Sequence, residues 1–206
     1  MAEPAPKGTS GHYFESSPSS RSAQKQVRLD LPDLSLTLLT DRGVFSPDRI
    51  DTGTKHLLLD APAPAAAGTL VDLGSGYGPI ACALATRAPA ATIWAIEVNE
   101  RARDLCRANA ERLGLTNLRT ASPDAVPADL VVDELWSNPP IRIGKAALHS
   151  LLGTWLGRLA SGGRALLVVQ KHLGADSLHR WLEAEGYAVD RLRSRAGYRL
   201  LEVHPA

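Results

Sequence analysis

Cysteine and long apolar runs are both scarce in this sequence of 206 residues. Its two cysteines, Cys82 and Cys106, lie in separate helix-like stretches without a CxxC pair, which argues against a disulfide framework and a zinc site. No stretch approaches the roughly 18 apolar residues that a membrane-spanning helix needs. The first residues contain no apolar core of a secretory signal. These absences predict a soluble, cytoplasmic protein that holds no metal and does not act at a membrane.

The bulk composition is that of an ordinary globular domain, with 44% hydrophobic and 22% charged residues. Its length fits one domain, or one domain with a small extension. The net charge of +1 hides an uneven distribution. Residues 141–206 carry ten Lys and Arg against five Asp and Glu, whereas residues 61–140 carry six against nine. A basic C-terminal third is compatible with a polyanionic partner, although solvated arginine-rich faces are more common than nucleic-acid sites.

The chain divides by composition into a tail, an extension and a core. Residues 1–10 are rich in Ala, Pro, Gly and Ser, and we expect them to be disordered. Residues 11–60 should form an extension that packs on the core, made of a β-hairpin around Pro32-Asp33 and a short helix over residues 54–60. The core is expected to span residues 61–206.

Beyond a Pro- and Ala-rich linker at residues 61–68, short apolar strands alternate with helices. We expect strands over residues 69–73, 92–97, 118–121, 130–136, 165–170, 187–192 and 198–204, and helices over residues 79–87, 99–113, 145–159 and 173–185. Helices long enough to cross over imply a doubly wound, mostly parallel sheet. The last two strands are too close in sequence for a crossover, so they should be antiparallel. The predicted fold is therefore Rossmann-like α/β, with a mostly parallel seven-stranded sheet and an antiparallel last strand.

A glycine-rich loop connects the first predicted core strand to the first helix. Its glycines allow a sharp turn and let a ligand lie against bare main chain, at the sheet edge where open parallel sheets bind ligands. The spacing is GxGxG rather than the GxGxxG of dinucleotide sites, and a carboxylate at Asp72 would repel a pyrophosphate. S-adenosylmethionine (SAM) has an ammonium and a sulfonium but no phosphate, so it suits the loop better than a nicotinamide cofactor. The loop residues that we assign to cofactor binding are Asp72, Gly74, Ser75, Gly76, Tyr77 and Gly78.

Two further strand ends carry acidic residues. Glu97, 25 residues after Asp72, can accept hydrogen bonds from both ribose hydroxyls of such a ligand, with Val98 beside it. The alternative for Glu97 is a surface carboxylate. Asp124 follows the third strand, where it could accept from an adenine amino group or could simply cap a turn.

Asn138-Pro139-Pro140 follows the fourth predicted strand. Two consecutive prolines hold the backbone extended and remove two donors, which leaves the Asn138 side-chain oxygen and the Pro139 carbonyl as acceptors. Two converging acceptors suit an exocyclic amino group, because holding both N–H bonds directs its lone pair toward an incoming methyl group. We therefore predict that these three residues are catalytic and that Asn138 also contacts the cofactor; the alternative is a rigid turn.

The order of these motifs resembles class I SAM-dependent methyltransferases that act on amino nitrogens. Three upstream segments narrow the resemblance: His12-Tyr13-Phe14, Gly43-Val44-Phe45-Ser46 and Asp51-Thr52-Gly53-Thr54-Lys55. With them, residues 11–206 resemble the RsmC-like "methyltransferase small domain" family, whose members methylate guanine N2 in small-subunit ribosomal RNA. The resemblance implies that SAM binds the glycine loop and Glu97, that Phe45 and Thr54 close over it, and that Asn138 and Pro139 grip the amine.

The chain departs from this family in three respects. It leaves no room for the second N-terminal copy that the larger guanine enzymes use for RNA docking. Ser75 stands where Cys is common, and Ile141 stands where Phe or Tyr usually stacks on the target base. Isoleucine offers no π surface. The acceptor therefore stays open among an RNA guanine, adenine N6 and a protein glutamine amide, and the non-enzyme alternative is a SAM- or RNA-binding module without catalysis.

Five residues are candidates for binding an RNA substrate. Arg142 and Lys145 flank the acceptor motif and could hold phosphates of a flipped-out nucleotide, although Lys145 could equally just begin a helix. Ile141 could contact a base face. Tyr198 and Arg199, on the last predicted hairpin, could line the substrate cleft or form an ordinary sheet edge.

Overall fold

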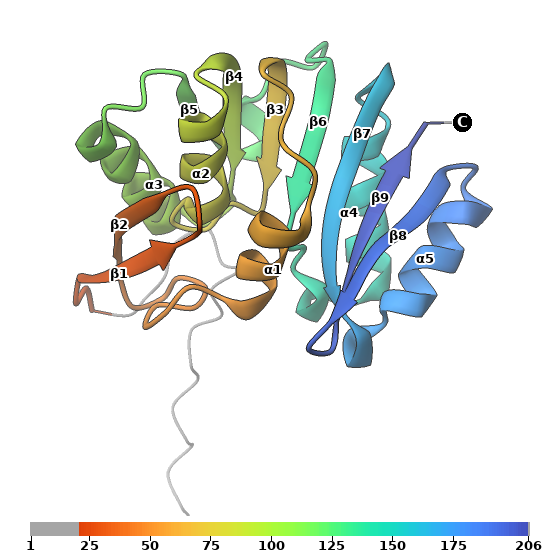
Figure 1. The fold of residues 1–206 in the computed structure, drawn as a ribbon, viewed down its shortest axis with the longest axis horizontal. Coiled ribbons are helices and arrows are strands. Elements are labelled where there is room, and N and C mark those ends of the chain that lie inside the picture. The colour runs from red at the N-terminus through yellow and green to blue at the C-terminus, as the bar shows by residue number, and fades with distance from the viewer. Residues whose placement is uncertain (1–20, 206) are drawn as a thin grey trace, which may run out of the picture.

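A computed structural model of the chain describes residues 21–205, built around a seven-stranded sheet (Figure 1). The strands are β3 (Ala67–Leu73), β4 (Ala90–Ile96), β5 (Leu118–Ala121), β6 (Val132–Ser137), β7 (Leu159–Gln170), β8 (Ala188–Arg195) and β9 (Tyr198–His204). Their order in the sheet is β5-β4-β3-β6-β7-β9-β8. All neighbours pair in parallel except at β9, which is antiparallel to both β7 and β8. The predicted Rossmann-like sheet with an antiparallel last strand is confirmed.

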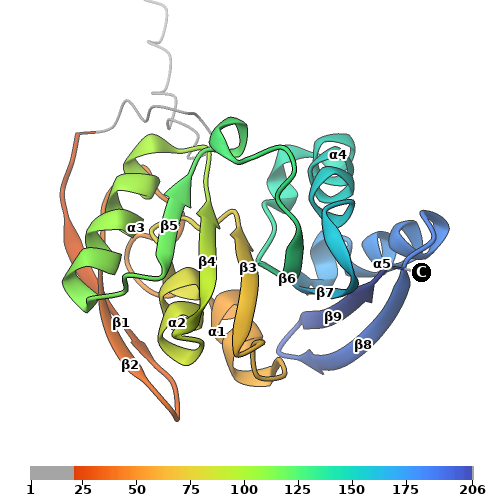
Figure 2. The ribbon, with the colours of Figure 1, turned by 90° about the horizontal axis from the view of Figure 1, so that it is seen from above.

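Five helices cover the two faces of the sheet. They are α1 (Thr52–Asp60), α2 (Pro79–Arg87), α3 (Glu100–Leu113), α4 (Lys145–Leu156) and α5 (Ala175–Ala184). Helices α1 and α2 lie on one side and α4 and α5 on the other (Figure 2). Because successive strand residues point to opposite faces, Leu166 and Val168 of β7 pack with the α1–α3 side, whereas Leu167 and Val169 pack with the α4–α5 side. The same alternation decides which side chains of the strands face the site described below.

The predicted N-terminal hairpin is present as β1 (Lys25–Asp30) and β2 (Ser35–Thr40). It packs outside α2 and α3. The Asn109 side chain of α3 accepts from the Leu39 amide at 2.6 Å and donates to the Leu39 carbonyl at 3.0 Å. Arg87 at the end of α2 pairs with Asp33 in the hairpin turn at 2.7 Å. The expected tail at residues 1–10 and the His12-Tyr13-Phe14 segment lie outside the described residues.

Several predicted boundaries differ from the structure, and glycines explain two of the differences. Strand β7 begins at Leu159, where a helix and then a glycine loop were expected. A Cβ on Gly163 would lie 3.0 Å from two carbonyl oxygens of β6, next to a register shift between the strands, so only glycine lets β7 continue there. Strand β3 begins at Ala67, inside the expected linker, because Gly68 adopts a φ of 100° and Asp133 accepts from the Thr69 amide at 2.7 Å.

Candidate active site

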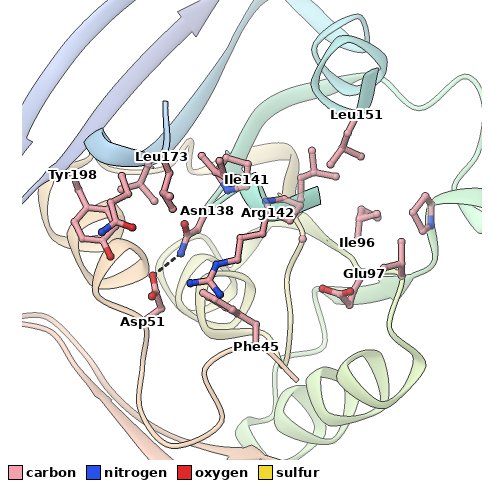
Figure 3. A pocket seen from close by; sticks show the side chains of 18 residues that line it. Phe45, Asp51, Ile96, Glu97, Asn138, Ile141, Arg142, Leu151, Leu173 and Tyr198 are labelled. Atoms are coloured by element: carbon pink, nitrogen blue, oxygen red, sulfur yellow. Dashed lines mark hydrogen bonds between the residues drawn. The ribbon is translucent and has the colours of Figure 1, made fainter. Parts of the chain in front are cut away.

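A cavity of about 280 Å³ opens at the carboxyl ends of the parallel strands. Three short 3-10 turns border this edge of the sheet: η1 (Pro123–Ala125) after β5, η2 (Ile141–Ile143) after β6 and η3 (Lys171–Leu173) after β7. Figure 3 shows Asn138 between two ends of the cavity. We call them the β4 end, with Ile96, Glu97 and Val98, and the β9 end, with Leu173 and Tyr198. Within residues 21–205 no group of three or more His, Cys, Asp or Glu could hold a metal ion, and no helix is long and apolar enough to cross a membrane.

The glycines of the loop after β3 serve two different purposes. Gly74 and Gly76 have φ values of 76° and 55°, which favour glycine. A Cβ on Gly76 would meet nothing within 4 Å, and one on Gly74 only the Pro140 ring at 3.8 Å, so the backbone there is open to a ligand. A Cβ on Gly78 would lie 2.5 Å from the Cys106 sulfur. Gly78 therefore permits close packing of α2 on α3, and it lies outside the cavity lining.

Most hydrogen-bond donors of this loop are already used inside the protein. The amides of residues 74–76 and 78 donate to protein oxygens at 2.9–3.0 Å. Pro79 has no amide hydrogen, and the Asp72 carboxylate accepts from the Ala81 amide at 2.9 Å. A pyrophosphate would find few of the free donors that usually bind it at a helix N-terminus. This geometry argues against a dinucleotide cofactor, as the GxGxG spacing does.

Asp72 does not line the cavity, contrary to the role expected for it. It shares a face of β3 with Leu70, which the α1–α3 side covers, and its side chain is fully buried beneath the loop. Burial raises the pKa of Asp72 to about 8. Its second carboxylate oxygen has no hydrogen-bond partner among the described residues. Asp72 therefore lies under the glycine loop rather than in the cavity wall.

Glu97 lines the β4 end with its carboxylate held in place by two amides. Its two oxygens accept from Gly76 and from Asn99, each at 2.9 Å, and burial raises its pKa. Each oxygen keeps a lone pair that a sugar hydroxyl could use. Val98, 42% exposed, lines the cavity beside it. Asp124 is exposed and outside the lining, where the Ser122 hydroxyl lowers its pKa; it is a turn residue by position.

Asn138 is held at the centre of the cavity by groups that fix the orientation of its amide. Its nitrogen donates to Asp51 Oδ1 at 2.6 Å and to the Thr54 hydroxyl at 3.2 Å (Figure 3). A carboxylate can only accept, so the amide nitrogen must face Asp51, which leaves the Asn138 oxygen for the cavity. Thr54 thus lies behind Asn138 and also borders a small pocket that adjoins the cavity.

Asp51 is the functional residue that our choice of site residues missed. Its carboxylate also accepts from the amides of Gly53 and Thr54 at 2.8 and 3.2 Å and so caps α1. The sequence signal was available, because an Asp directly before a helix is a preferred N-cap. What the signal could not reveal is the contact with Asn138, which lies 87 residues further along the chain.

The proline pair joins the acceptor motif to the glycine loop. The Ser137 hydroxyl donates to the Leu73 carbonyl at 2.7 Å, and Pro140 faces Gly74. We had expected the Pro139 carbonyl to be free, but it is not. It accepts from the Ile141 amide at 2.8 Å because the chain turns tightly into η2, and it keeps one lone pair for another donor.

The structure brings most of the predicted site residues together and separates a few. Lys145 is exposed at the start of α4 and does not reach the lining. Arg199 is also outside it, because alternation along β9 turns Arg199 to the α4–α5 side, where it pairs with Asp176, while Tyr198 faces the cavity. The predicted residues that line the cavity or its adjoining pocket are Phe45, Thr54, Gly74, Ser75, Gly76, Tyr77, Glu97, Val98, Asn138, Pro139, Pro140, Ile141, Arg142 and Tyr198.

The sheet order and the cavity at its carboxyl edge define the Rossmann-like fold of class I methyltransferases. The family model described as "Methyltransferase small domain" matches residues 35–202. The chain belongs to this family.

Two curated relatives cover most of the chain. A Bacillus subtilis (strain 168) protein described as "Uncharacterized protein YbxB" is 33% identical over 197 residues, which are 94% of this chain and 98% of that protein. "Ribosomal RNA small subunit methyltransferase C" of Shewanella piezotolerans is 30% identical over 152 residues, which are 72% of this chain. The matched segment is 44% of the Shewanella protein, so the chain corresponds to less than half of that enzyme's length.

A solved structure shares the fold. The "T. Thermophilus 16S rRNA N2 G1207 methyltransferase (RsmC) in complex with AdoMet and Guanosine" superposes with a TM-score of 0.76 at 22% identity. The match covers 92% of this chain and 52% of that one. At this identity the likeness establishes the fold alone.

Proposed function

We propose that this protein is a SAM-dependent methyltransferase that transfers a methyl group to an exocyclic amino nitrogen, namely that of a guanine in ribosomal RNA. The observation that carries the proposal is the orientation of the Asn138 amide. Its nitrogen donates to Asp51 and Thr54, so the atom that faces the methyl-accepting substrate is the amide oxygen. Because the Asn138 oxygen can only accept a hydrogen bond, it favours a substrate that brings an N–H donor to the site beside the glycine loop.

The β4 end fits SAM by its chemistry. Glu97 supplies two acceptors for the ribose hydroxyls, Gly74 leaves exposed backbone on the cavity wall, and Gly76 borders the small adjoining pocket. The Ser75 hydroxyl borders the small adjoining pocket and has no hydrogen-bond partner in the described part of the chain. A ligand that carries hydroxyl and ammonium donors suits these oxygen acceptors.

Bound SAM supplies an electrophilic methyl group, and the residues of this chain would orient the nitrogen that receives it. Asn138 Oδ1 and the remaining lone pair of the Pro139 carbonyl would each accept one N–H bond of the amino group. Fixing both bonds directs the nitrogen lone pair, and positioning of this kind supplies much of the rate of such a transfer. The displaced proton can leave to water after the transfer, so the residues need not include a strong base.

The charge around the cavity supports a polyanionic acceptor. Arg142 lines the cavity, and Lys171 lies between two lining residues, Gln170 and Leu173. Lys145 lies one turn beyond Arg142. All three cations are exposed, and their side chains have no hydrogen-bond or ion-pair partner among residues 21–205. Free cations around a site favour phosphates over a neutral protein amide, in line with the names of the Shewanella and T. thermophilus relatives.

The test is to incubate the purified protein with methyl-labelled SAM and, separately, with ribosomal RNA or subunits, DNA and protein extract. We expect label that is nuclease-sensitive and confined to the RNA pool. Label confined to protein would replace the proposal with glutamine-amide methylation, and label in DNA with adenine methylation. SAM binding without transfer to any pool would indicate a binding module without catalysis.

A further inference from the structure

We propose that Tyr198, at the start of β9, provides the face on which the acceptor base stacks. Ile141, which follows the proline pair, does not provide such a face. This inference rests on the proposed function. It specifies the acceptor as a planar aromatic amine, held between Asn138 and the β9 end of the cavity.

Residue 141 lines the cavity but is unsuited to aromatic stacking. Ile141 begins η2 and packs against the core cluster on the α4–α5 side of the sheet. Its side chain has no π face. A stacking partner for a base must therefore come from another wall of the cavity.

Tyr198 lies beside the groups that orient Asn138. Its ring atom Cε1 is 2.9 Å from the position that a Cβ on Gly53 would take, and Asp51 Oδ1 is 3.0 Å from that same position. The same Asp51 oxygen holds the Asn138 amide at 2.6 Å. The tyrosine ring is therefore a close neighbour of the amine-binding group, and Gly53 is the residue that leaves it room.

The ring contacts a histidine of α1 and borders the cavity. His56 of α1 lies 5.6 Å away between ring centroids, tilted by 46°. Burial, together with the nearby Asp51 carboxylate, raises the pKa of Tyr198, so the phenol stays neutral at physiological pH. Leu173, 44% exposed, adds an apolar side chain at the same end (Figure 3). A rigid aromatic ring with an apolar neighbour is the usual composition of a base-stacking platform.

This arrangement divides recognition of the acceptor between two elements. The end of β6 would take the amino hydrogens through Asn138, while the start of β9 would take the ring face. An aliphatic glutamine amide could use the first contact but would gain little from the second. Tyr198 is thus expected to set the preference for a nucleobase over a protein amide.

The experiment compares Tyr198→Leu, Tyr198→Phe and Tyr198→Trp by kcat and KM on ribosomal RNA, with SAM affinity measured for each variant. Loss of stacking in Tyr198→Leu should raise KM for RNA by about 5- to 150-fold, because base–aromatic stacking has an effect of that size. Tyr198→Phe and Tyr198→Trp should stay within about threefold of wild type, since both keep a π face. SAM affinity should not change in any of them.

Tyr187→Leu is the matched control. Tyr187 is also partly buried, but it packs on the α4–α5 side and does not line the cavity. The inference is overturned if Tyr198→Leu methylates RNA as wild type does, or if Tyr198→Phe is as impaired as Tyr198→Leu, because the hydroxyl would then matter rather than the ring. A wild-type protein that methylates no RNA would instead overturn the proposed function on which the inference rests.

Discussion

The two ends of the cavity are constructed in different ways. The β4 end comes from loops that follow two adjacent parallel strands, β3 and β4, and Glu97 ties those loops together through the Gly76 amide. The β9 end and Asn138 beside it depend on the segment before α1, the end of β6 and the start of β9, which are far apart in the chain. A binding site at a sheet edge follows from topology, whereas acceptor recognition depends on long-range contacts that can vary without disturbing the sheet.

The largest effect that would separate the two ends is expected from Asn138→Ala. Without the amide oxygen, the amine is no longer oriented, so kcat should fall by about 10³-fold, in the range found when a positioned transition-state group is removed. SAM affinity should stay within about twofold, because the β4 end is untouched. Single-turnover rates and calorimetric titration of SAM would measure both, and normal turnover would show that Asn138 does not grip the acceptor.

Glu97→Ala should have the opposite effect, on SAM affinity rather than on kcat. Removing the carboxylate that we propose for the ribose hydroxyls should weaken SAM binding by about 10- to 100-fold, since hydrogen bonds to charged groups contribute about 1.5–3 kcal/mol. At saturating SAM, kcat should change only a few-fold. Glu97→Gln, which keeps one acceptor oxygen, should fall between Glu97→Ala and wild type. A variant with unchanged SAM affinity would place the ribose elsewhere.

A smaller effect is expected at Asp51, which connects the N-terminal extension to the β9 end. Asp51→Ala frees the Asn138 amide and should lower kcat about tenfold, and loss of the α1 cap should cost about 1 kcal/mol of unfolding free energy. Asp51→Asn keeps an acceptor for the cap, so its stability should be close to wild type. If Asp51→Ala loses stability but not turnover, Asp51 is a helix cap and nothing more.

The effect expected at Asp72 is on stability rather than on methyl transfer, and it depends on pH. Its pKa is raised from 3.8 to about 8 in the folded protein, so its contribution to stability is fully present below about pH 4 and is lost as the pH rises to about 8. Asp72→Asn removes this dependence. Wild type and variant should therefore differ little at pH 4 and progressively more toward pH 8, by at most about 1.4 kcal/mol per pH unit. Denaturant unfolding of the ligand-free proteins measures the difference, and a gap that does not vary with pH would contradict a buried neutral carboxyl.

The difference between the two ends also explains what the sequence could predict. The strand–helix alternation, the glycine loop and Glu97 depend on local patterns and on sheet topology, and all are found where expected. Gly163 was assigned to a loop because its need for glycine comes from the carbonyls of β6, which local sequence does not contain. The Asp51–Asn138 contact was missed for the same reason.

The prediction that Arg199 lines the cleft together with Tyr198 could have been corrected from the sequence. Tyr198 and Arg199 are consecutive residues of one strand, so only one of them can face the cavity. The structure selects Tyr198 and pairs Arg199 with Asp176 on the other side. The Pro139 carbonyl is different, because its use by Ile141 depends on the tightness of the following turn.

The most direct measurement is to digest RNA that the protein has methylated to nucleosides and to locate the methyl group by mass spectrometry. The oxygen that Asn138 offers to the cavity predicts methylation of an exocyclic amino nitrogen, as N2-methylguanosine. A methyl group on a ribose hydroxyl, a ring carbon or a ring nitrogen would contradict the account, since none of those acceptors presents the two N–H donors that we propose Asn138 and Pro139 to bind.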